Sequence, residues 1–272
     1  AAAIGGWTLT TKEGQGASGT VFRAVRSDGA TSALKGARTA EPWTAREARL
    51  LARAQRRWGP ALLATGRRED DMTAPSGVML RRGAWWMATT WVDGEALGAR
   101  LAQGRRSSHD ARRMLAAVVA HGVGRGLDEL HHAGLRHGDV KPANILLGPA
   151  LPTVDRARDR GATLVDLDLA TEIADGRVEG GTPRYLAPEL RAGEQATPAA
   201  DLHALGLVLA EILVPELADA PELDPARVED ALGNIPGESR AIAAWIHALV
   251  ARAPGARPSA EWLATRAARV LD

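Results

Sequence analysis

Alternating apolar and polar residues, broken by glycines, mark the first third of the chain. Segments rich in β-branched and aromatic residues cover residues 7–11, 20–25, 31–34, 77–80 and 85–92. Short segments of this kind, bounded by turn residues, are typical of strands in an antiparallel sheet. Because Asp93 and Gly94 break the pattern, we expect a strand-rich part that ends near residue 92.

A helical repeat interrupts these strands. Glu47, Leu50, Leu51 and Ala54 recur at the spacing of one helix face, and Pro42 suits the first turn of a helix. We therefore expect a helix here, with Glu47 and Leu51 on the same face.

The rest of the chain changes to a helical period. Apolar residues predict helices over residues 111–131, 198–214 and 239–251, with strands and loops over residues 135–165. A strand-rich lobe followed by a helical lobe indicates an α+β fold. The charged run over residues 155–160 is expected to be a solvated loop.

The composition of the 272 residues narrows the class of protein. Hydrophobic residues make up 45% and charged residues 25%, as in globular proteins with a core of their own. The 34 basic and 33 acidic residues leave a net charge of +1, which argues against nucleic acid as a partner. The absence of cysteine excludes disulfides and cysteine-ligated zinc, and it fits a cytoplasmic protein.

We expect no membrane span. The longest apolar run, residues 202–214, contains His203 and Glu211 and is shorter than the ~18 residues that suggest a spanning helix. The chain begins without a methionine or a signal peptide, and we expect the natural protein to be longer.

A glycine-rich turn separates the first two predicted strands. Gly14, Gly16 and Gly19 stand in a G-x-G-x-x-G-x-V pattern that ends at Val21. Residues without a Cβ let backbone N–H groups approach phosphate oxygens closely. Because a strand follows the turn, the pattern differs from a dinucleotide-binding fingerprint, and alone it is also typical of an ordinary hairpin.

Lys35 ends the next strand, and Glu47 follows it on the predicted helix. A carboxylate there would hold the ammonium group toward phosphates, whereas an isolated lysine and glutamate would be solvated surface residues. The order of glycine loop, lysine and helical glutamate favours the first interpretation. Glu41 is a rival for this pairing, but it precedes Pro42 and so falls outside the helix.

Three later segments carry the most specific pattern in the chain. They read LRHGDVKPANILL from Leu135, LVDLDLA from Leu164 and GTPRYLAPE from Gly181. In this order they resemble the catalytic loop, the metal-binding motif and the peptide-docking segment of eukaryotic-type serine/threonine protein kinases.

The resemblance implies both a fold and a reaction. We expect one bilobal kinase domain, with an N-lobe over residues 7–92, the end of a hinge over residues 93–95 and a C-lobe over residues 96–272. The implied reaction transfers the γ-phosphoryl group of ATP to serine or threonine hydroxyls of a protein substrate, with Mg²⁺, or Mn²⁺ in its place, as cofactor.

Individual residues take roles by the same resemblance. Asp139 would accept the proton of the substrate hydroxyl, and Lys141 would contact the transferring phosphate. Asn144 and Asp166 would supply oxygen ligands to Mg²⁺. Thr182, which faces Lys141 in the family, indicates serine or threonine rather than tyrosine as the acceptor.

The nucleotide would be bound by the paired lysine, by the glycine loop and by the hinge segment. The expected residues are Gly14, Gly16, Ser18, Gly19, Val21, Ala33, Lys35, Thr89, Thr90 and Val92. Asp201 resembles the buried aspartate that ties down the catalytic loop, and Arg257 resembles the arginine that pairs with Glu189. His137 is expected to be a core histidine rather than a proton shuttle.

Two positions depart from the kinase pattern. Gly138 replaces the usual arginine before the catalytic aspartate, and Leu167-Asp168 replaces the last two residues of the D-F-G motif. Both are reminiscent of aminoglycoside-type small-molecule phosphotransferases, the alternative function, and a catalytically dead scaffold is a third. The docking segment favours a protein kinase over the first alternative, and Lys35 and Asp139 disfavour the second.

Asp168 has two interpretations. We expect it to enter the left-handed region in place of glycine and to bring a carboxylate near the metal, or to be a solvent-facing turn aspartate.

The missing arginine also bears on regulation. In kinases that are switched by phosphorylation, that arginine pairs with a phosphate on the activation segment. Residues 169–181 offer only Thr171 as a hydroxyl, so we expect activity without phosphorylation. The alternative is that Arg136, Arg177 or Arg184 binds such a phosphate. The sequence leaves the substrate's identity and the oligomeric state open.

Overall fold

The computed structural model describes residues 2–16, 18–37, 43–54, 57–103, 107–148, 161–176, 178, 180–233 and 235–272. The chain divides into two compact units, Ala1–Val92 and Asp93–Asp272. Pro42, Arg177 and the charged run over residues 155–160 lie outside the described residues.

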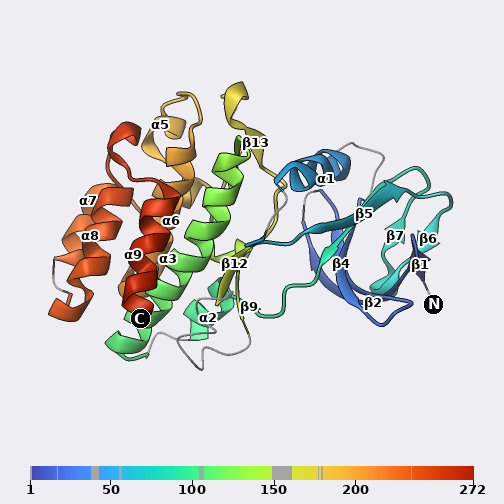
Figure 1. The fold of residues 1–272 in the computed structure, drawn as a ribbon, viewed down its shortest axis with the longest axis horizontal. Coiled ribbons are helices and arrows are strands. Elements are labelled where there is room, and N and C mark those ends of the chain that lie inside the picture. The colour runs from blue at the N-terminus through green and yellow to red at the C-terminus, as the bar shows by residue number, and fades with distance from the viewer. Residues whose placement is uncertain are drawn as a thin grey trace. The chain divides into compact units, whose positions relative to one another are not determined.

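The first unit is built on an antiparallel sheet (Figure 1). Its strands are hydrogen-bonded in the order β1 (Ala3–Ile4), β2 (Trp7–Gln15), β3 (Thr20–Arg26), β4 (Thr31–Gly36), β8 (Trp85–Thr90) and β5 (Leu62–Arg67). A separate pair is formed by β6 (Met72–Thr73) and β7 (Met79–Leu80). The predicted strands are confirmed, although the segment over residues 77–80 contains only the short β7.

Alternation along the strands places one face of this sheet in an apolar core. In β2, Trp7 and Leu9 are buried, whereas Thr8 and Thr10, which alternate with them, are exposed. The indole N–H of Trp7 donates a hydrogen bond to Ser32 Oγ at 3.0 Å, so its polar atom is satisfied inside the core. The main buried residues of this core are Trp7, Leu9, Phe22, Leu34, Leu80 and Trp86.

The helix α1 (Trp43–Ala54) packs against β5 and β8. Glu47, Leu50, Leu51 and Ala54 are among its buried residues, which confirms the face predicted from their spacing. The helix therefore places the carboxylate of Glu47 among mostly apolar residues.

The second unit is mainly helical. Its helices are α2 (Leu97–Gln103), α3 (His109–His132), α5 (Pro188–Arg191), α6 (Pro198–Leu213), α7 (Pro225–Leu232), α8 (Arg240–Leu249) and α9 (Ala260–Leu271). The strands β9 (Glu95–Ala96), β11 (Ile145–Leu147) and β12 (Ala162–Leu164) form one small sheet, and β10 (Leu135–Arg136) pairs with β13 (Thr171–Glu172). The three predicted helices correspond to α3, α6 and α8, and the α+β class is confirmed.

Helix α6 forms the centre of the second unit. Leu205, Leu207 and Val208 are 0% exposed, so its long apolar run is enclosed by protein. Helix α3 packs against α6 and α9 and approaches β12 closely (Figure 1). A Cβ at Gly122 of α3 would stand 2.1 Å from the carbonyl oxygen of Ala162, so only glycine fits there. Among the described residues, no helix is long and apolar enough to cross a membrane.

Candidate active site

The glycine loop joins β2 to β3. Gly16 N donates to the carbonyl oxygen of Gly19 at 2.9 Å, which closes the turn. A Cβ at Gly19 would stand 2.6 Å from the carbonyl oxygen of Gly36, so this glycine permits close strand packing. Gly14 and Gly16 have nothing within 4 Å of such a Cβ, so their faces are open to a ligand.

Lys35 and Glu47 form a buried ion pair inside the first unit. The Nζ of Lys35, on β4, lies 2.9 Å from Oε2 of Glu47, on α1, and their side chains are 9% and 4% exposed. Such a pair is held in place because removing either partner would leave an uncompensated buried charge. Sequence order predicted this pairing, and the structure brings the two residues together.

The segment predicted to be the hinge begins at the end of β8. Thr89 is buried and lies opposite Ala33 in the register of β4 and β8. Thr90 is tied to the sheet edge, because its N–H donates to the carbonyl oxygen of Ala61 and its Oγ1 accepts from Ala61 N, both at 2.9 Å. Val92 is the last residue of the first unit.

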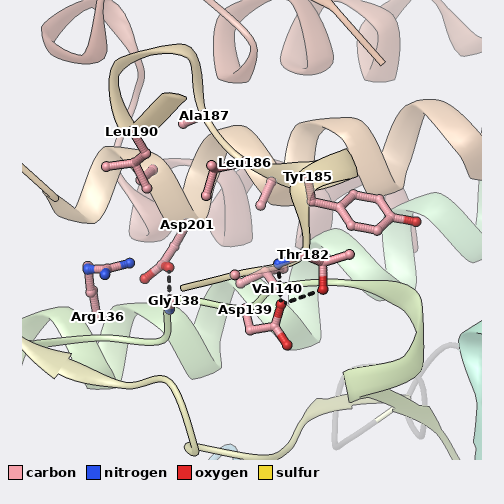
Figure 2. A pocket seen from close by; sticks show the side chains of 13 residues that line it. Arg136, Gly138, Asp139, Val140, Thr182, Tyr185, Leu186, Ala187, Leu190 and Asp201 are labelled. Carbon is pink, nitrogen blue, oxygen red and sulfur yellow. Dashed lines mark hydrogen bonds between the residues drawn. The ribbon is translucent and has the colours of Figure 1, made fainter. Parts of the chain in front are cut away.

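Asp139, Lys141 and Thr182 form a compact polar cluster in the second unit, and Figure 2 shows the contact between Asp139 and Thr182. Oδ1 of Asp139 accepts from the backbone N of Thr182 at 3.1 Å and from its Oγ1 at 2.8 Å. Lys141 Nζ lies 2.5 Å from Asp139 Oδ2 and donates to Thr182 Oγ1 at 3.1 Å. Thus 43 residues of chain are closed into a loop that places the threonine against the aspartate.

The Asp139 carboxylate is charged at neutral pH. Burial raises its pKa, but hydrogen bonds from Lys141 and Thr182 outweigh burial and hold the pKa below its ordinary value. Asn144 fixes the loop from the other side, since its Nδ2 donates to the Asp139 backbone oxygen at 2.9 Å and to Oδ2 at 3.2 Å. The carboxylate is therefore charged and held in a fixed orientation.

Asn144 and Asp166 are held in adjacent segments. The Asn144 backbone oxygen accepts from Val165 N at 2.9 Å, one residue before Asp166. Asp166 has a φ of 69°, the left-handed region that non-glycine residues seldom enter. Its Oδ1 accepts from Asp168 N at 3.3 Å.

The prediction that Asp168 takes up the left-handed conformation is wrong. Among the described non-glycine residues, positive φ occurs only at Ser76 and Asp166. The turn after β12 is therefore accommodated at Asp166, where the side chain bonds the backbone two residues later, as Asp side chains do in tight turns.

Asp201 anchors the backbone that precedes Asp139. It is 2% exposed, and its two oxygens accept from His137 N at 2.8 Å and Gly138 N at 2.9 Å. His131 Nε2 lies 3.0 Å from Oδ2. Burial raises the pKa of Asp201, but the His131 contact and neighbouring positive charge outweigh it, so the pKa lies below its ordinary value.

His137 is a core histidine, as expected. Its ring is 0% exposed, its Nε2 lies 3.1 Å from the carbonyl oxygen of Val165, and its Nδ1 accepts from Asp139 N at 3.2 Å. These contacts require the neutral tautomer with hydrogen on Nε2. The ring therefore orients the catalytic loop.

Arg136 and Gly138 line the same small pocket beside this loop (Figure 2). Arg136 is 1% exposed and lines a small cavity of about 20 Å³ together with Gly138, Asp139 and Asp201. Gly138 has a φ of 82°, and a Cβ there would stand 2.5 Å from the carbonyl oxygen of Leu169. The departure from the family pattern at Gly138 is thus matched to a buried arginine two residues earlier.

The predicted docking segment is fixed by one buried and one partly buried ion pair. Arg257 binds Glu189 in a bidentate arrangement, with Nη1 at 2.6 Å and Nη2 at 2.8 Å from the two carboxylate oxygens. Arg184 binds Oε1 of Glu211 through Nε at 2.8 Å and Nη2 at 2.6 Å, while Tyr185 donates to Oε2 at 2.9 Å.

The sequence predicted the first of these pairs and missed the second. The Arg257–Glu189 pair was expected from the family resemblance, whereas nothing local in the sequence marks Glu211, which lies 27 residues from Arg184 on an apolar helix. The one available sign was a carboxylate inside an otherwise apolar run, since a buried charge requires a partner.

Comparison with known proteins agrees with this geometry. Serine/threonine-protein kinase PknA of Mycobacterium tuberculosis is 40% identical over 118 residues, 43% of this chain and 25% of that protein. The probable serine/threonine-protein kinase PkwA of Thermomonospora curvata is 36% identical over 126 residues, 46% of this chain and 16% of that protein. PkaB of Streptomyces coelicolor, also a serine/threonine-protein kinase, is 38% identical over 130 residues, 45% of this chain and 29% of that protein.

These relatives are much longer than the region that matches. This chain covers less than a third of the length of each of them. The family match is broader, because residues 7–261 match the protein kinase domain. The chain therefore belongs to the protein kinase domain family.

Proposed function

We propose that this chain is the catalytic domain of a serine/threonine protein kinase, which transfers the γ-phosphoryl group of ATP to a hydroxyl group of a protein substrate. The observation that carries the proposal is the cluster of Asp139, Lys141 and Thr182. An ionised carboxylate accepts hydrogen bonds beside a lysine, at the start of the segment that docks protein substrates in this family. Phosphoryl transfer requires an oriented hydroxyl and neutralised phosphate charge, and this cluster supplies groups for both.

The proposed roles follow from the chemistry of each group. Asp139 orients the substrate hydroxyl and accepts its proton, and Lys141 neutralises charge on the transferring phosphoryl group. Lys35, fixed by Glu47, binds nucleotide phosphates, and the open faces of Gly14 and Gly16 admit phosphate oxygens. Ser18, Gly19, Val21, Ala33, Thr89, Thr90 and Val92 complete the proposed nucleotide contacts.

The residues also fit a magnesium ion. Both amide hydrogens of Asn144 point toward Asp139, so its Oδ1 is the atom left for a cation. Asp166 adds a carboxylate on the adjacent segment, and oxygen donors are the ligands that Mg²⁺ prefers. When bound, the ion would neutralise charge on the phosphates. Asn144 and Asp166 would hold it, and Mn²⁺ accepts the same ligands.

We further propose that activity does not require phosphorylation of the activation segment. Gly138 has no side chain to bind a phosphate. Thr171, the one hydroxyl between Leu169 and Gly181, is 1% exposed and pairs through β13 with β10, so it is inaccessible to a second kinase. The segment is held instead by the contacts of Thr182 and Glu189.

A transfer assay tests the proposed function. The purified chain would be incubated with radiolabelled ATP and Mg²⁺, with and without a generic protein substrate, and the products mapped to individual residues. Label on serine or threonine supports the proposal. Label only on small hydroxylated or amino compounds would indicate a small-molecule phosphotransferase, and nucleotide binding without transfer would indicate a scaffold.

A further inference from the structure

A second pocket lies in the helical unit, away from the small cavity beneath the catalytic loop. It is bounded by α2, the first turns of α3, the end of α6 and the turn over Pro215–Asp219, and its volume is about 140 Å³. A cavity of about 150 Å³ holds a molecule the size of benzene, so this pocket has room for one side chain. Its lining includes the apolar residues Leu101, Leu115 and Ile212 and the charged residues Arg100, Arg112 and Glu211.

Glu211, the acidic residue that lines the pocket, is not available to bind a cation there. Both oxygens of Glu211 are already bonded, one to the Arg184 guanidinium and the other to the Tyr185 hydroxyl. Arg184 also donates to the backbone oxygens of Leu217, at 2.6 Å, and Ala220, which fixes it on the carboxylate. The negative charge of Glu211 is therefore neutralised from within the chain.

The two basic residues that line the pocket, Arg100 and Arg112, differ from Glu211 because neither has a strong partner among the described residues. Arg100 pairs with Glu95, and both side chains are largely exposed, so this pair binds weakly and leaves Arg100 available to a stronger partner. The Nε of Arg112 is enclosed by protein and has no hydrogen-bond partner among the described residues. An enclosed donor without an acceptor is unfavourable, and a carboxylate oxygen in the pocket would satisfy it.

The pocket is connected to the candidate active site by a single turn. Arg184 and Tyr185, which hold Glu211, belong to the turn over Pro183–Tyr185, and that turn begins directly after Thr182. Thr182 in turn contacts Asp139. The turn that holds Glu211 thus continues directly into the residue that contacts Asp139.

We propose that this pocket binds an aspartate or glutamate side chain of the protein substrate, so that the enzyme selects acceptor sites with an acidic residue nearby. The inference rests on the proposed kinase function. The carboxylate would be bound by Arg112, with Arg100 as a second cation, and the methylene groups would contact Leu101 and Leu115. Arginine and a carboxylate form the strongest class of side-chain hydrogen bonds because both are charged and can bond through two parallel contacts.

Paired peptides test this selectivity. Each pair carries one serine acceptor with glutamate or glutamine at a single position, and the position is moved along the peptide on both sides of the serine. For the native chain, glutamate should raise kcat/KM about tenfold over glutamine at one or two positions, the effect of one charge-assisted hydrogen bond. A ratio near one at every position, with phosphorylation still occurring, overturns the inference alone.

Variants locate the effect in the pocket. Arg112→Gln should reduce the glutamate-to-glutamine ratio to near one, and Arg112→Glu should reverse it, so that the glutamine peptide is preferred. Arg113→Gln is the matched control, because Arg113 is the next residue of α3, binds Asp110 at 3.1 Å and does not line the pocket. It should keep the native ratio. Loss of the ratio in both variants alike would place selectivity elsewhere and overturn the inference.

Two other outcomes separate a failure of the proposed function from a failure of this inference. If no peptide and no generic protein is phosphorylated by the native chain, the proposed function itself fails. If phosphoserine raises kcat/KM at the selected position while glutamate does not, the pocket binds a phosphate rather than a carboxylate, and the inference fails as stated. Melting temperatures of the variants show whether each is folded, and the native-chain peptide series stands even if one is not.

Discussion

Nη1 of Arg136 lies 3.2 Å from the point where a Cβ at Gly138 would stand. The buried guanidinium and a side chain at residue 138 therefore compete for the same space. The usual kinase arrangement, with an arginine immediately before the catalytic aspartate, does not fit this loop unless both Arg136 and the backbone of Leu169 move.

We predict that Gly138→Ala destabilises the chain more than a comparable glycine replacement does. Gly138 and Gly193 both have positive φ, 82° and 78°, but only Gly138 has atoms close to the added Cβ. Both replacements carry the cost of the left-handed conformation, and Gly138→Ala should add about 1–3 kcal/mol from overlap. Urea unfolding of the two variants measures the difference, and equal destabilisation would show that the loop relaxes freely.

Replacing Asp139 and Asp166 should abolish phosphoryl transfer by different routes. Asp139→Ala removes the proton acceptor and should reduce kcat by about 10²–10⁴, with the apparent affinity for nucleotide retained. Asp166→Ala removes a metal ligand, so its activity should depend much more steeply on Mg²⁺ concentration. Asp175→Ala, an exposed aspartate of the same segment, is the control. Native transfer by Asp166→Ala at limiting Mg²⁺ would contradict the assigned metal ligands.

The unphosphorylated chain should be fully active. Phosphatase treatment, checked by mass spectrometry, is expected to leave initial rates on a protein substrate unchanged, because Thr171 is buried and Gly138 offers no phosphate-binding side chain. A tenfold drop that is reversed when Thr171 or Thr182 is phosphorylated again would contradict this prediction and direct attention to Arg136 or Arg184 as the phosphate-binding group.

Breaking the Glu189–Arg257 pair should destabilise the chain strongly. Glu189→Gln leaves the Arg257 guanidinium, whose side chain is 0% exposed, without its counter-charge, and the expected cost is about 3–5 kcal/mol. The matched control is Asp71→Asn, which breaks an exposed pair with Arg81 and should therefore cost much less stability. Denaturant unfolding measures the stability of both variants. If both lose a similar amount of stability, burial does not determine the cost of breaking the pair.

His203 should make the fold sensitive to mild acid. Burial, followed by the nearby Arg257 charge, lowers its pKa to about 4, and neither ring nitrogen has a hydrogen-bond partner among the described residues. In the unfolded chain its pKa is about 6.5. Between these values the unfolded state binds a proton that the folded state does not, so stability falls as pH falls through this range, by about 3 kcal/mol in total.

His203→Phe should remove this part of the pH dependence. The comparison is made by unfolding both proteins between pH 7 and pH 4. Asp201 and Glu189 also have lowered pKa values, so the stability that they contribute is lost only at lower pH. That loss should remain in the variant. If the two proteins show parallel curves over this range, His203 is not the titrating group.

The candidate catalytic residues could be predicted from sequence because they belong to motifs that occur in a fixed order. Asp139, Lys141 and Asn144 lie within one short segment, and the pairing of Lys35 with Glu47 follows from a strand end and a helix face. The bond between Arg184 and Glu211 could not be predicted, because it joins a turn to the far end of an apolar helix. The conformation of Asp166 was also missed, since which residue of a turn enters the left-handed region depends on the contacts of the whole loop.

The separation of Glu189 from Arg257 has a consequence for the order in which the protein folds. The two residues are 68 positions apart, so Arg257 is synthesised well after Glu189. Until then Glu189 has no buried counter-charge, and the cost of closing so long a loop is not offset by the contact. The contacts of the segment that contains Glu189 are therefore completed only after residue 257 has been synthesised, so a chain translated only as far as Glu189 lacks the partner that fixes this segment.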